Sequence, residues 1–474
     1  MNARRVIAMV VCVFSSLVAA GTSGATSSAA TLGSQGNVLW RFQVSGQYVS
    51  QPPAVGPDGG VVVASSTGDV YSLTAAGALR WVIRGVGASG GPSIGADGTV
   101  YVASMNAVRA IAADGSIRWS FTEPSVGQGV IAGPTVGPDG NIYVISDYGG
   151  LGAFALSPAG QLLWSNSGNP TFSEYGQDGA AIVFGSGRLY AAFDEFGVAA
   201  STMFGLSVGG AQQWARPLGG SDDPFMQQQR QPATGADGSL YMTAMGGANG
   251  WSLFRVDPAS GALLWNYSPW PSNGMSPPSV GPDGSVYFSR SLSYLESLTP
   301  AGQSRWTFFD GSIIDHPAVS PDGSVVVAGV RPNFGEPGSV RAWNAATGSV
   351  AWQVDLPNEN GGYQVLETQP RFAADSRTAY FGTAILAGGE EYSFLYAVTS
   401  GSVTPPPPTA QCVVPGVVGL TLDTARARII GAGCSVGKIS RVRSGQVGIV
   451  LAQSPAAGSK LPQGSPVDLT VGRK

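Results

Sequence analysis

The sequence predicts an all-β fold, an eight-bladed β-propeller of four-stranded antiparallel blades, followed by a small C-terminal α+β domain. Glycine (69) and proline (33) are abundant in the 474 residues, and only 11% are charged, which indicates turn-rich β structure. Tight-turn signals recur along the chain. Eight tryptophans follow one another at intervals of 38 to 51 residues, the length of one propeller blade. They are Trp40, Trp81, Trp119, Trp164, Trp214, Trp265, Trp306 and Trp352.

The N-terminus has the pattern of an export signal. Arg4 and Arg5 precede an apolar run over residues 6–20, and small residues stand before Gly21. An N-terminal membrane anchor is the alternative, but about fifteen apolar residues are short for a bilayer. We therefore expect cleavage after residue 20, a flexible segment over 21–35, and a mature chain that is secreted or held in the periplasm or cell envelope.

The formal net charge of the chain is small. The formal charge of −4 becomes −6 when the two arginines of residues 1–20 are removed. No basic stripe is evident, which argues against nucleic acid as a partner. No segment after residue 20 is long and apolar enough to predict a transmembrane helix.

Residues 36–400 consist of eight copies of a strand–turn–strand unit. Most copies carry a Pro-Asp-Gly or Ala-Asp-Gly turn between their first two strands, in which glycine takes the positive φ and aspartate bonds to its own backbone. Calcium binding or acid catalysis is the alternative role for these aspartates; the turn is favoured. For the tryptophans, packing between blades is favoured over stacking on a ligand. The turn aspartates are Asp58, Asp97, Asp139, Asp237, Asp283, Asp322 and Asp375.

The two ends of this region predict how the ring closes. The chain begins with a lone outer-strand signal near Trp40, and its last repeat ends on a third strand near Tyr396. The last blade therefore lacks an outer strand that the first segment can supply. We expect residues 37–43 to pair with residues 394–399 and so close the ring.

The Gly-x-x-x-Trp, Pro-x-Val-x-x-Asp-Gly-x-Val-Tyr and Tyr-x-Leu elements resemble the PQQ-type propeller repeat over residues 36–400. Its relatives are the quinoprotein alcohol dehydrogenases and the outer-membrane-assembly lipoprotein propellers. If this chain were like the dehydrogenases, the resemblance would imply a quinone held beside a disulfide of two adjacent cysteines, together with a calcium ion and an aspartate base. This chain has no cysteine between Cys12 and Cys412, and His316 is its single histidine. We expect no cofactor, metal ion or catalytic residue; a quinone-dependent or polysaccharide-acting enzyme is the alternative.

Function, if the ring has a binding site, is expected where the repeats differ from one another. Residues just before the inner strands should surround the mouth of a central channel and suit a small polar ligand or peptide; a hydrated funnel is the alternative. These candidates are Gln51, Asp178, Arg230, Gln231, Asp315, His316 and Gln369. Loop aromatics could stack on sugars or a partner, or cap blade edges. They are Phe225, Tyr267, Trp270, Phe334 and Tyr363.

A proline-rich linker over residues 401–411 precedes a small unit over residues 412–474. Thr421 should cap a helix from Leu422 to about Ile430, with strands expected over 436–440, 449–453 and 467–471. Cys412 and Cys434 flank this helix in an exported chain, which predicts a disulfide. Closing that loop would stabilise the unit by roughly 3 kcal/mol.

This unit resembles a PASTA domain, on Val414-Pro415-Gly416-Val417-Val418-Gly419, Ala432-Gly433-Cys434 and Gln453-Ser454-Pro455-Ala456-Ala457-Gly458. The resemblance implies peptidoglycan fragments or β-lactams as ligands. The chain has one copy and neither the kinase nor the transpeptidase that usually accompanies it, so a purely structural role stays open. Together these observations predict an exported, non-enzymatic binding or scaffold protein of the cell envelope, with the propeller as its interaction platform.

Overall fold

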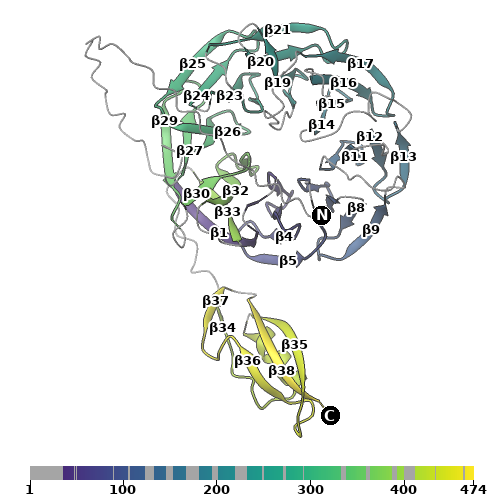
Figure 1. Cartoon of the computed structure of the whole chain (residues 1–474), viewed down its shortest axis with the longest axis vertical. Helices are drawn as coiled ribbons and strands as arrows, with labels where there is room; N and C mark the ends of the chain where they lie inside the picture. Colours follow the sequence, from purple (N-terminus) through teal and green to yellow (C-terminus); the bar gives the residue numbers. More distant parts are fainter. Residues whose placement is uncertain are drawn as a thin grey trace, which may run out of the picture. The chain divides into compact units, whose positions relative to one another are not determined.

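A computed structural model describes most of the chain from residue 36 onward. The described ranges are 36–46, 48–49, 51–88, 90–104, 107–122, 133–145, 153–166, 181–194, 201–218, 232–247, 250–270, 274–291, 293–331, 338–358, 363–386, 392–399, 411–432, 434–462 and 465–473. Within them, eight antiparallel sheets follow one another around a ring (Figure 1), which confirms the eight-bladed propeller.

Each blade runs from an inner strand at the axis to an outer strand at the rim. Blade 1 comprises β2 (Ala54–Val55), β3 (Val61–Ala64), β4 (Val70–Leu73) and β5 (Leu79–Ile83). Blade 2 comprises β6 (Ser93–Ile94), β7 (Val100–Ser104), β8 (Ala107–Ile111) and β9 (Ile117–Thr122). Blade 3 comprises β10 (Thr135–Val136), β11 (Ile142–Ile145), β12 (Ala153–Leu156) and β13 (Leu162–Ser165). Blades 4 and 5 comprise β14 (Ala181–Gly185), β15 (Arg188–Asp194), β16 (Ser201–Ser207) and β17 (Gln212–Pro217); and β18 (Ala233–Thr234), β19 (Leu240–Gly247), β20 (Gly250–Val256) and β21 (Leu263–Tyr267).

The remaining blades follow the same order, with an irregular inner strand in the last one. Blade 6 comprises β22 (Ser279–Val280), β23 (Val286–Arg290), β24 (Tyr294–Leu298) and β25 (Ser304–Phe309), and blade 7 comprises β26 (Ile313–Val319), β27 (Val325–Arg331), β28 (Ser339–Asn344) and β29 (Val350–Asp355). Blade 8 comprises β30 (Tyr363–Leu366), β31 (Arg371–Phe372), β32 (Thr378–Leu386), β33 (Tyr392–Thr399) and β1 (Asn37–Ser45).

The first strand of the chain closes the ring. β1 pairs antiparallel with β33, from Asn37 opposite Thr399 to Ser45 opposite Tyr392. This confirms the predicted pairing of residues 37–43 with residues 394–399. Blade 8 is therefore built from both ends of the propeller, and the N-terminal segment supplies its outer strand.

The repeated tryptophans pack between blades, as predicted. The indole N–H of Trp119 in blade 2 donates to the carbonyl of Pro158 in blade 3, at 2.9 Å, and the ring covers Gly160 of the same turn. Six other tryptophans make the equivalent bond to the next blade. Trp352 of blade 7 instead covers Gly36, immediately before β1, because the N-terminal strand takes the place of the missing turn.

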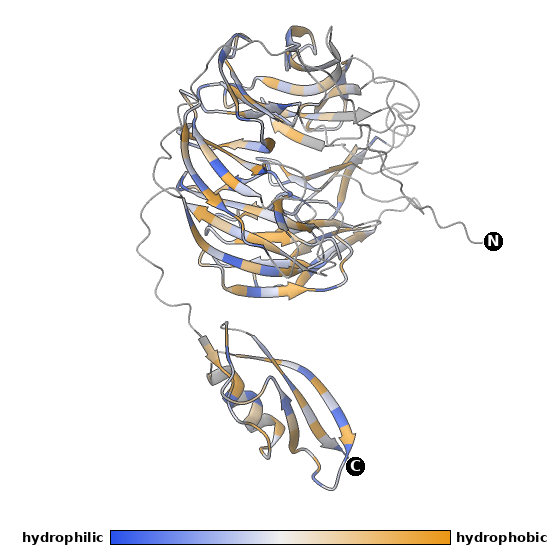
Figure 2. Cartoon of the chain, turned by 60° about the vertical axis from the view of Figure 1, so that its left-hand side comes forward, coloured by the Kyte–Doolittle hydropathy of each residue, from blue (hydrophilic) through white to orange (hydrophobic). Residues whose placement is uncertain are grey.

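The core lies between the middle strands of neighbouring blades. Every residue of β3, β4, β11 and β12 is buried, whereas the outer strand β9 alternates between exposed and half-buried residues. Tyr143 and Ile145 of blade 3, for example, pack against Leu189 and Ala191 of blade 4. Figure 2 shows the corresponding alternation of hydrophobic and hydrophilic residues along the outer strands. A blade has two apolar faces, and stacking in a ring covers both.

The Pro-Asp-Gly segments form the predicted hairpin turns. In blade 1, Gly59 has a φ of 74°, and the Asp58 carboxylate accepts the backbone N–H of Gly60 at 2.9 Å. That bond is the largest cause that lowers the pKa of Asp58, and Arg80 lowers it further. The aspartate therefore holds the turn that joins the two inner strands.

The C-terminal unit is a separate α+β fold. The central strand β38 (Pro466–Arg473) pairs in parallel with β35 (Ser435–Arg443) and antiparallel with β36 (Val450–Ser454), while β34 (Gln411–Val413) pairs with β37 (Lys460–Pro462). Helix α2 (Leu422–Gly431) begins after Thr421, whose hydroxyl accepts the N–H of Thr424 at 3.4 Å. Ala425 and Ile429 of the helix are buried against the sheet, as their spacing predicts.

The predicted disulfide joins Cys412 to Cys434 and lies in this core. Gln453, from the motif that suggested the family, joins residues 415–417 to its own segment, 453–455. Its side-chain carbonyl accepts the N–H of Val417, and its amide donates to the carbonyls of Pro415 and Pro455. Among the described residues, no helix has the length and apolar character needed to cross a bilayer.

Candidate functional site

The candidate site lies where the inner strands of blades 7 and 8 are interrupted. In blade 7 the pairing of β26 with β27 shifts between Asp315 and Ala318. In blade 8 the inner strand is split into β30 and β31, which both pair with β32 and leave residues 367–370 between them. The Gln369 side-chain amide donates to the carbonyl of Pro317 at 3.0 Å. The two interruptions are therefore in contact, and we name residues 315–317 and 367–370 the inner-rim break.

His316 stands in a strained position within this break. Its φ is 53°, a left-handed conformation that is uncommon for residues other than glycine. Its Nδ1 atom is buried and makes no hydrogen bond with any residue that the structure describes. Burial lowers the pKa of the imidazole against the opposing effect of Asp315, so the ring is neutral near pH 7. Strained residues of this kind cluster at functional sites.

Two carboxyl groups and one guanidinium share the break. Arg331 lies 3.4 Å from the Asp315 carboxylate, and each side chain is about one-fifth exposed. Burial raises the pKa of Asp315, although His316 and Arg331 both favour its ionised form. Glu367 retains exposed surface, but the surrounding protein desolvates its carboxyl; this raises the pKa of Glu367, and the nearby Asp315 raises it further.

This arrangement can hold a polar group and can exchange protons. The two acids and Arg331 offer hydrogen-bond acceptors and donors within one enclosed region. A carboxyl group with a raised pKa is a better proton donor near neutral pH than an ordinary one. Structural ion-pair networks shift pKa values in the same way, so the shifts mark a candidate site and define no reaction.

Several predicted channel-mouth residues are placed by the structure and others are not. Asp315, His316 and Gln369 come together in the inner-rim break. Gln51 lies in the equivalent segment of blade 1, where its side chain lies beside Gly91 of blade 2. Asp178, Arg230 and Gln231 lie outside the described residues. Their part in a binding site stays a prediction.

The predicted loop aromatics lie in different surroundings, and two of them are outside the described residues. Tyr267 ends β21 and packs edge-on against Phe288 of blade 6, with ring centroids 6.1 Å apart. Burial raises the pKa of Tyr267 to about 12, and the neighbouring Glu296 adds to the rise. Trp270, in contrast, is 76% exposed. Tyr363 begins β30 and pairs with Leu386, and Phe225 and Phe334 lie outside the described residues.

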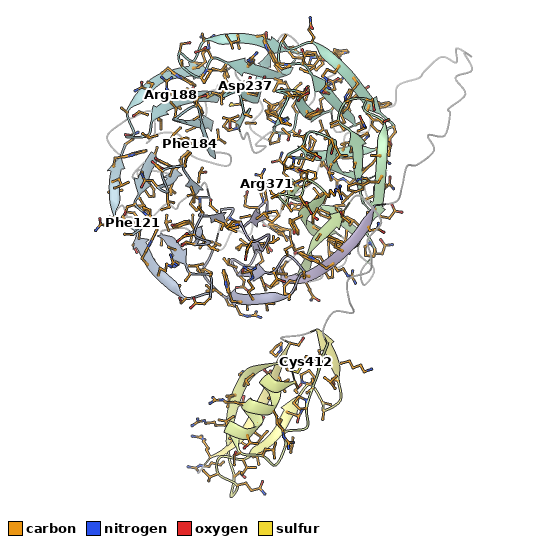
Figure 3. All side chains as sticks on the ribbon, turned by 180° about the vertical axis from the view of Figure 1, so that it is seen from behind. Phe121, Phe184, Arg188, Asp237, Arg371 and Cys412 are labelled. Carbon is orange, nitrogen blue, oxygen red and sulfur yellow. A yellow bond between two sulfur atoms is a disulfide. The ribbon has the colours of Figure 1, made fainter. Side chains whose placement is uncertain are left out.

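Three residues of this region were missed by sequence reasoning: Arg331, Glu367 and Arg371. Arg371 is exposed on the inner side of the ring (Figure 3). A sequence signal for it existed. At the same position before the turn, the other repeats have small or β-branched residues. These are Ala54, Ser93, Thr135, Val183, Ala233, Ser279 and Ala318.

Comparisons with known proteins agree with this architecture. The structure of BamB from Moraxella catarrhalis superposes with a TM-score of 0.55 at 16% identity, covering 76% of this chain and 99% of that one. The C-terminal WD40 domain of Sif2 gives the same TM-score at 10% identity, with 78% and 99% covered. At such low identities, these superpositions show the shared propeller fold alone.

The C-terminal unit has its own relatives. A probable serine/threonine-protein kinase of Clostridium acetobutylicum is 40% identical over 62 residues, 13% of this chain and 9% of the kinase. The chain thus spans a small part of that relative. The PASTA domain family matches residues 413–473, and the family described as outer membrane protein assembly factor BamB matches residues 26–267 and 248–391. Because the second family covers more than half of the sequence, this chain belongs to the BamB family and carries a C-terminal PASTA domain.

Proposed function

We propose that this chain is an exported, non-enzymatic binding protein of the cell envelope. In this proposal the PASTA domain attaches the molecule to peptidoglycan, and the propeller binds a partner protein or a small polar ligand. The observation that carries the proposal is the union, in one chain, of a BamB-family ring with a PASTA domain.

Two features of the ring support a binding role. The inner-rim break brings Asp315 and Gln369 together beside Arg331, and these polar side chains can contact a small ligand or a peptide. Trp270 lies on the connection from blade 5 to blade 6 and exposes 76% of its surface. Exposed tryptophans of this kind are enriched among the residues that dominate protein interfaces.

Export is part of the proposal, since residues 1–20 have the pattern of a signal peptide. We expect the protein recovered from outside the cytoplasm to begin at Gly21. N-terminal sequencing of that protein tests this step. An intact residue 1 on envelope-associated protein would contradict cleavage and favour an N-terminal anchor.

One observation favours a second candidate, an enzyme that acts on a polysaccharide. Asp315 and Glu367 are neighbouring carboxyl groups with raised pKa values, and pairs of carboxyl groups perform acid and base steps in glycoside hydrolysis. A quinone-dependent enzyme has less support, because no pair of adjacent cysteines exists in the sequence.

The deciding experiment is a pull-down of the mature protein on purified peptidoglycan, together with two controls for chemistry. We expect retention on peptidoglycan, no quinone absorbance after incubation with quinone and calcium, and no release of reducing ends from cell-wall glycans. Failure of the protein to bind purified peptidoglycan would contradict the proposed attachment to the wall. Glycan cleavage that disappears in Glu367→Gln would favour the enzyme.

A further inference from the structure

The PASTA domain differs from the ring in charge. Residues 412–474 contain eight lysines and arginines but two aspartates, a formal excess of six positive charges. Residues 21–411 contain fifteen arginines and no lysine against 27 acidic residues, an excess of twelve negative charges. The mild overall charge therefore hides a basic domain joined to an acidic one. A polyanion would be attracted by the first and repelled by the second.

Three arginines of this domain gather at one end of its sheet. Arg443 of β35 and Arg473 of β38 are register partners, and Arg441 lies two residues before Arg443 on the same strand. The N–H of Ser444 donates to the carbonyl of Arg473 at 2.9 Å, so the backbone pairing continues to this end. All three side chains are exposed. We name them the arginine cluster.

Among the side chains that the structure describes in this domain, no carboxylate forms an ion pair with the arginine cluster. Asp468 is at the opposite end of β38, where it accepts the backbone N–H of Lys438 at 2.6 Å. Asp423, the second acid of the domain, belongs to the first turn of α2, where the N–H of Leu422 donates to the carbonyl of Gly448, and its side chain is outside those that the structure describes. Like charges that face each other on paired strands destabilise a sheet, so the pairing of Arg443 with Arg473 carries a cost in the absence of an anion.

The composition of the domain restricts what this surface can recognise. Residues 412–474 contain no phenylalanine, tryptophan or tyrosine. The domain thus lacks the rings that stack on sugars and the aromatic anchors that are enriched at membrane interfaces. Recognition must come from charge and hydrogen bonds, and arginine forks match the oxygens of phosphate groups.

We propose that the arginine cluster binds a linear, phosphate-bearing polymer of the cell envelope. Arg441, Arg443 and Arg473 contact the phosphate groups. The exposed Arg428, Lys438 and Lys460 add long-range attraction for the rest of an extended polyanion. The inference deepens the proposed attachment to the wall, because it assigns the contact to anionic polymers that accompany peptidoglycan.

The test uses the mature full-length protein and long-chain inorganic polyphosphate as the probe, followed by fluorescence anisotropy. The double variant Arg443→Gln/Arg473→Gln should bind at least about tenfold more weakly, since it loses two charge-assisted contacts. The matched control Lys438→Gln/Lys460→Gln removes the same charge from the same domain and should lose no more than about threefold. Equal losses in the two variants would overturn the cluster as a site, as would no loss in either.

Further arms identify the chemistry. Polygalacturonate, a carboxylate polymer, and vesicles of phosphatidylglycerol should bind more weakly than polyphosphate; tighter binding to either would overturn the assignment. Cell walls stripped of phosphate polymers with hydrofluoric acid separate this inference from the proposed function. If the protein binds stripped and unstripped walls equally, and the double variant does too, this inference fails while peptidoglycan attachment stands. If it binds unstripped walls alone, the inference stands and attachment to peptidoglycan itself fails.

Discussion

Glu367 and Asp139 are carboxyl groups of the same ring whose pKa values move in opposite directions. Desolvation raises the pKa of Glu367, so the folded protein binds this proton more tightly than the unfolded chain does. Stability from this group is present below the ordinary glutamate pKa of about 4.3 and is lost as the pH rises toward the raised value. Glu367→Gln removes that loss. We expect its melting temperature to exceed that of the wild type by roughly 1–2 °C at pH 7, because solvent moderates the effect, and to match it near pH 4.

Asp139→Asn is the contrasting variant. Tyr143 and the backbone N–H of Asn141 donate to this carboxylate, and together they lower the pKa of Asp139 in spite of partial desolvation. Its contribution is therefore present at neutral pH and is lost as the pH falls through the depressed value. The variant should melt below the wild type at pH 7, with the gap closing under acid. Thermal melts from pH 3 to pH 8 check both signs; parallel curves for all three proteins would contradict the assignment.

The residues of the candidate site show why sequence reasoning found part of it. Asp315 and His316 stood out because they interrupt a repeat at a strand start. Arg331 ends a strand that otherwise fits the pattern, and its proximity to Asp315 depends on how β26 and β27 pair. Glu367 reaches the same region from the next blade. The first contact depends on strand register within blade 7 and the second crosses between blades, and neither leaves a mark in a single repeat, so these two residues could not be predicted from sequence.

At the scale of the element, the turn glycines combine two requirements that can be separated. Gly160 has a φ of 81° and supports the Trp119 ring, whose Cδ2 would lie 2.6 Å from an added Cβ. Gly98 has a φ of 79° but has nothing within 4 Å of an added Cβ. Gly98→Ala should cost about 1 kcal/mol for the left-handed backbone alone. Gly160→Ala should cost at least about 2 kcal/mol, because the indole must also move.

Chemical denaturation of the two glycine variants measures the difference. The tryptophan contact is the excess loss in Gly160→Ala over Gly98→Ala. Equal losses would mean that the indole shifts freely and that backbone strain is the whole cost. Both turns were evident in the sequence, since Gly98 ends an Ala-Asp-Gly turn and Gly160 begins a Gly-x-x-x-Trp element. The sequence also predicted that the tryptophans pack between blades, but it did not show that the indole of one blade covers the turn glycine of the next.

Strand β1 is the element on which closure of the ring depends. It was predictable because counting strands left the last repeat one short and the first segment one over. Deleting residues 21–44 removes the partner of β33 and also Gly36, which lies against Trp352. We expect the melting temperature of the propeller to fall by more than about 10 °C. A chain that begins at Gly36 retains β1 and is the control; equal stability of the two truncations would show that closure does not need β1.

At the scale of the whole molecule, residues 21–474 contain two cysteines, and both form the disulfide of the PASTA domain. The bond joins two residues that are 22 positions apart in the sequence. The domain is small, so its hydrophobic core alone stabilises it only marginally. The double variant Cys412→Ser/Cys434→Ser should lower the stability of this domain by roughly 3 kcal/mol. The propeller contains neither cysteine, so its own unfolding should not change.

Differential scanning calorimetry of the mature protein separates these effects, since a chain with two domains need not unfold in one step. The wild type should show two transitions, and one of them should fall in temperature in the serine variant. A reducing agent should reproduce that fall in the wild type and leave the variant unchanged, because the variant has no bond to reduce. If both transitions shift together, the domains unfold as one cooperative unit and the disulfide stabilises the entire molecule; if neither shifts, the bond contributes little beyond what the packed core around Cys412 already supplies.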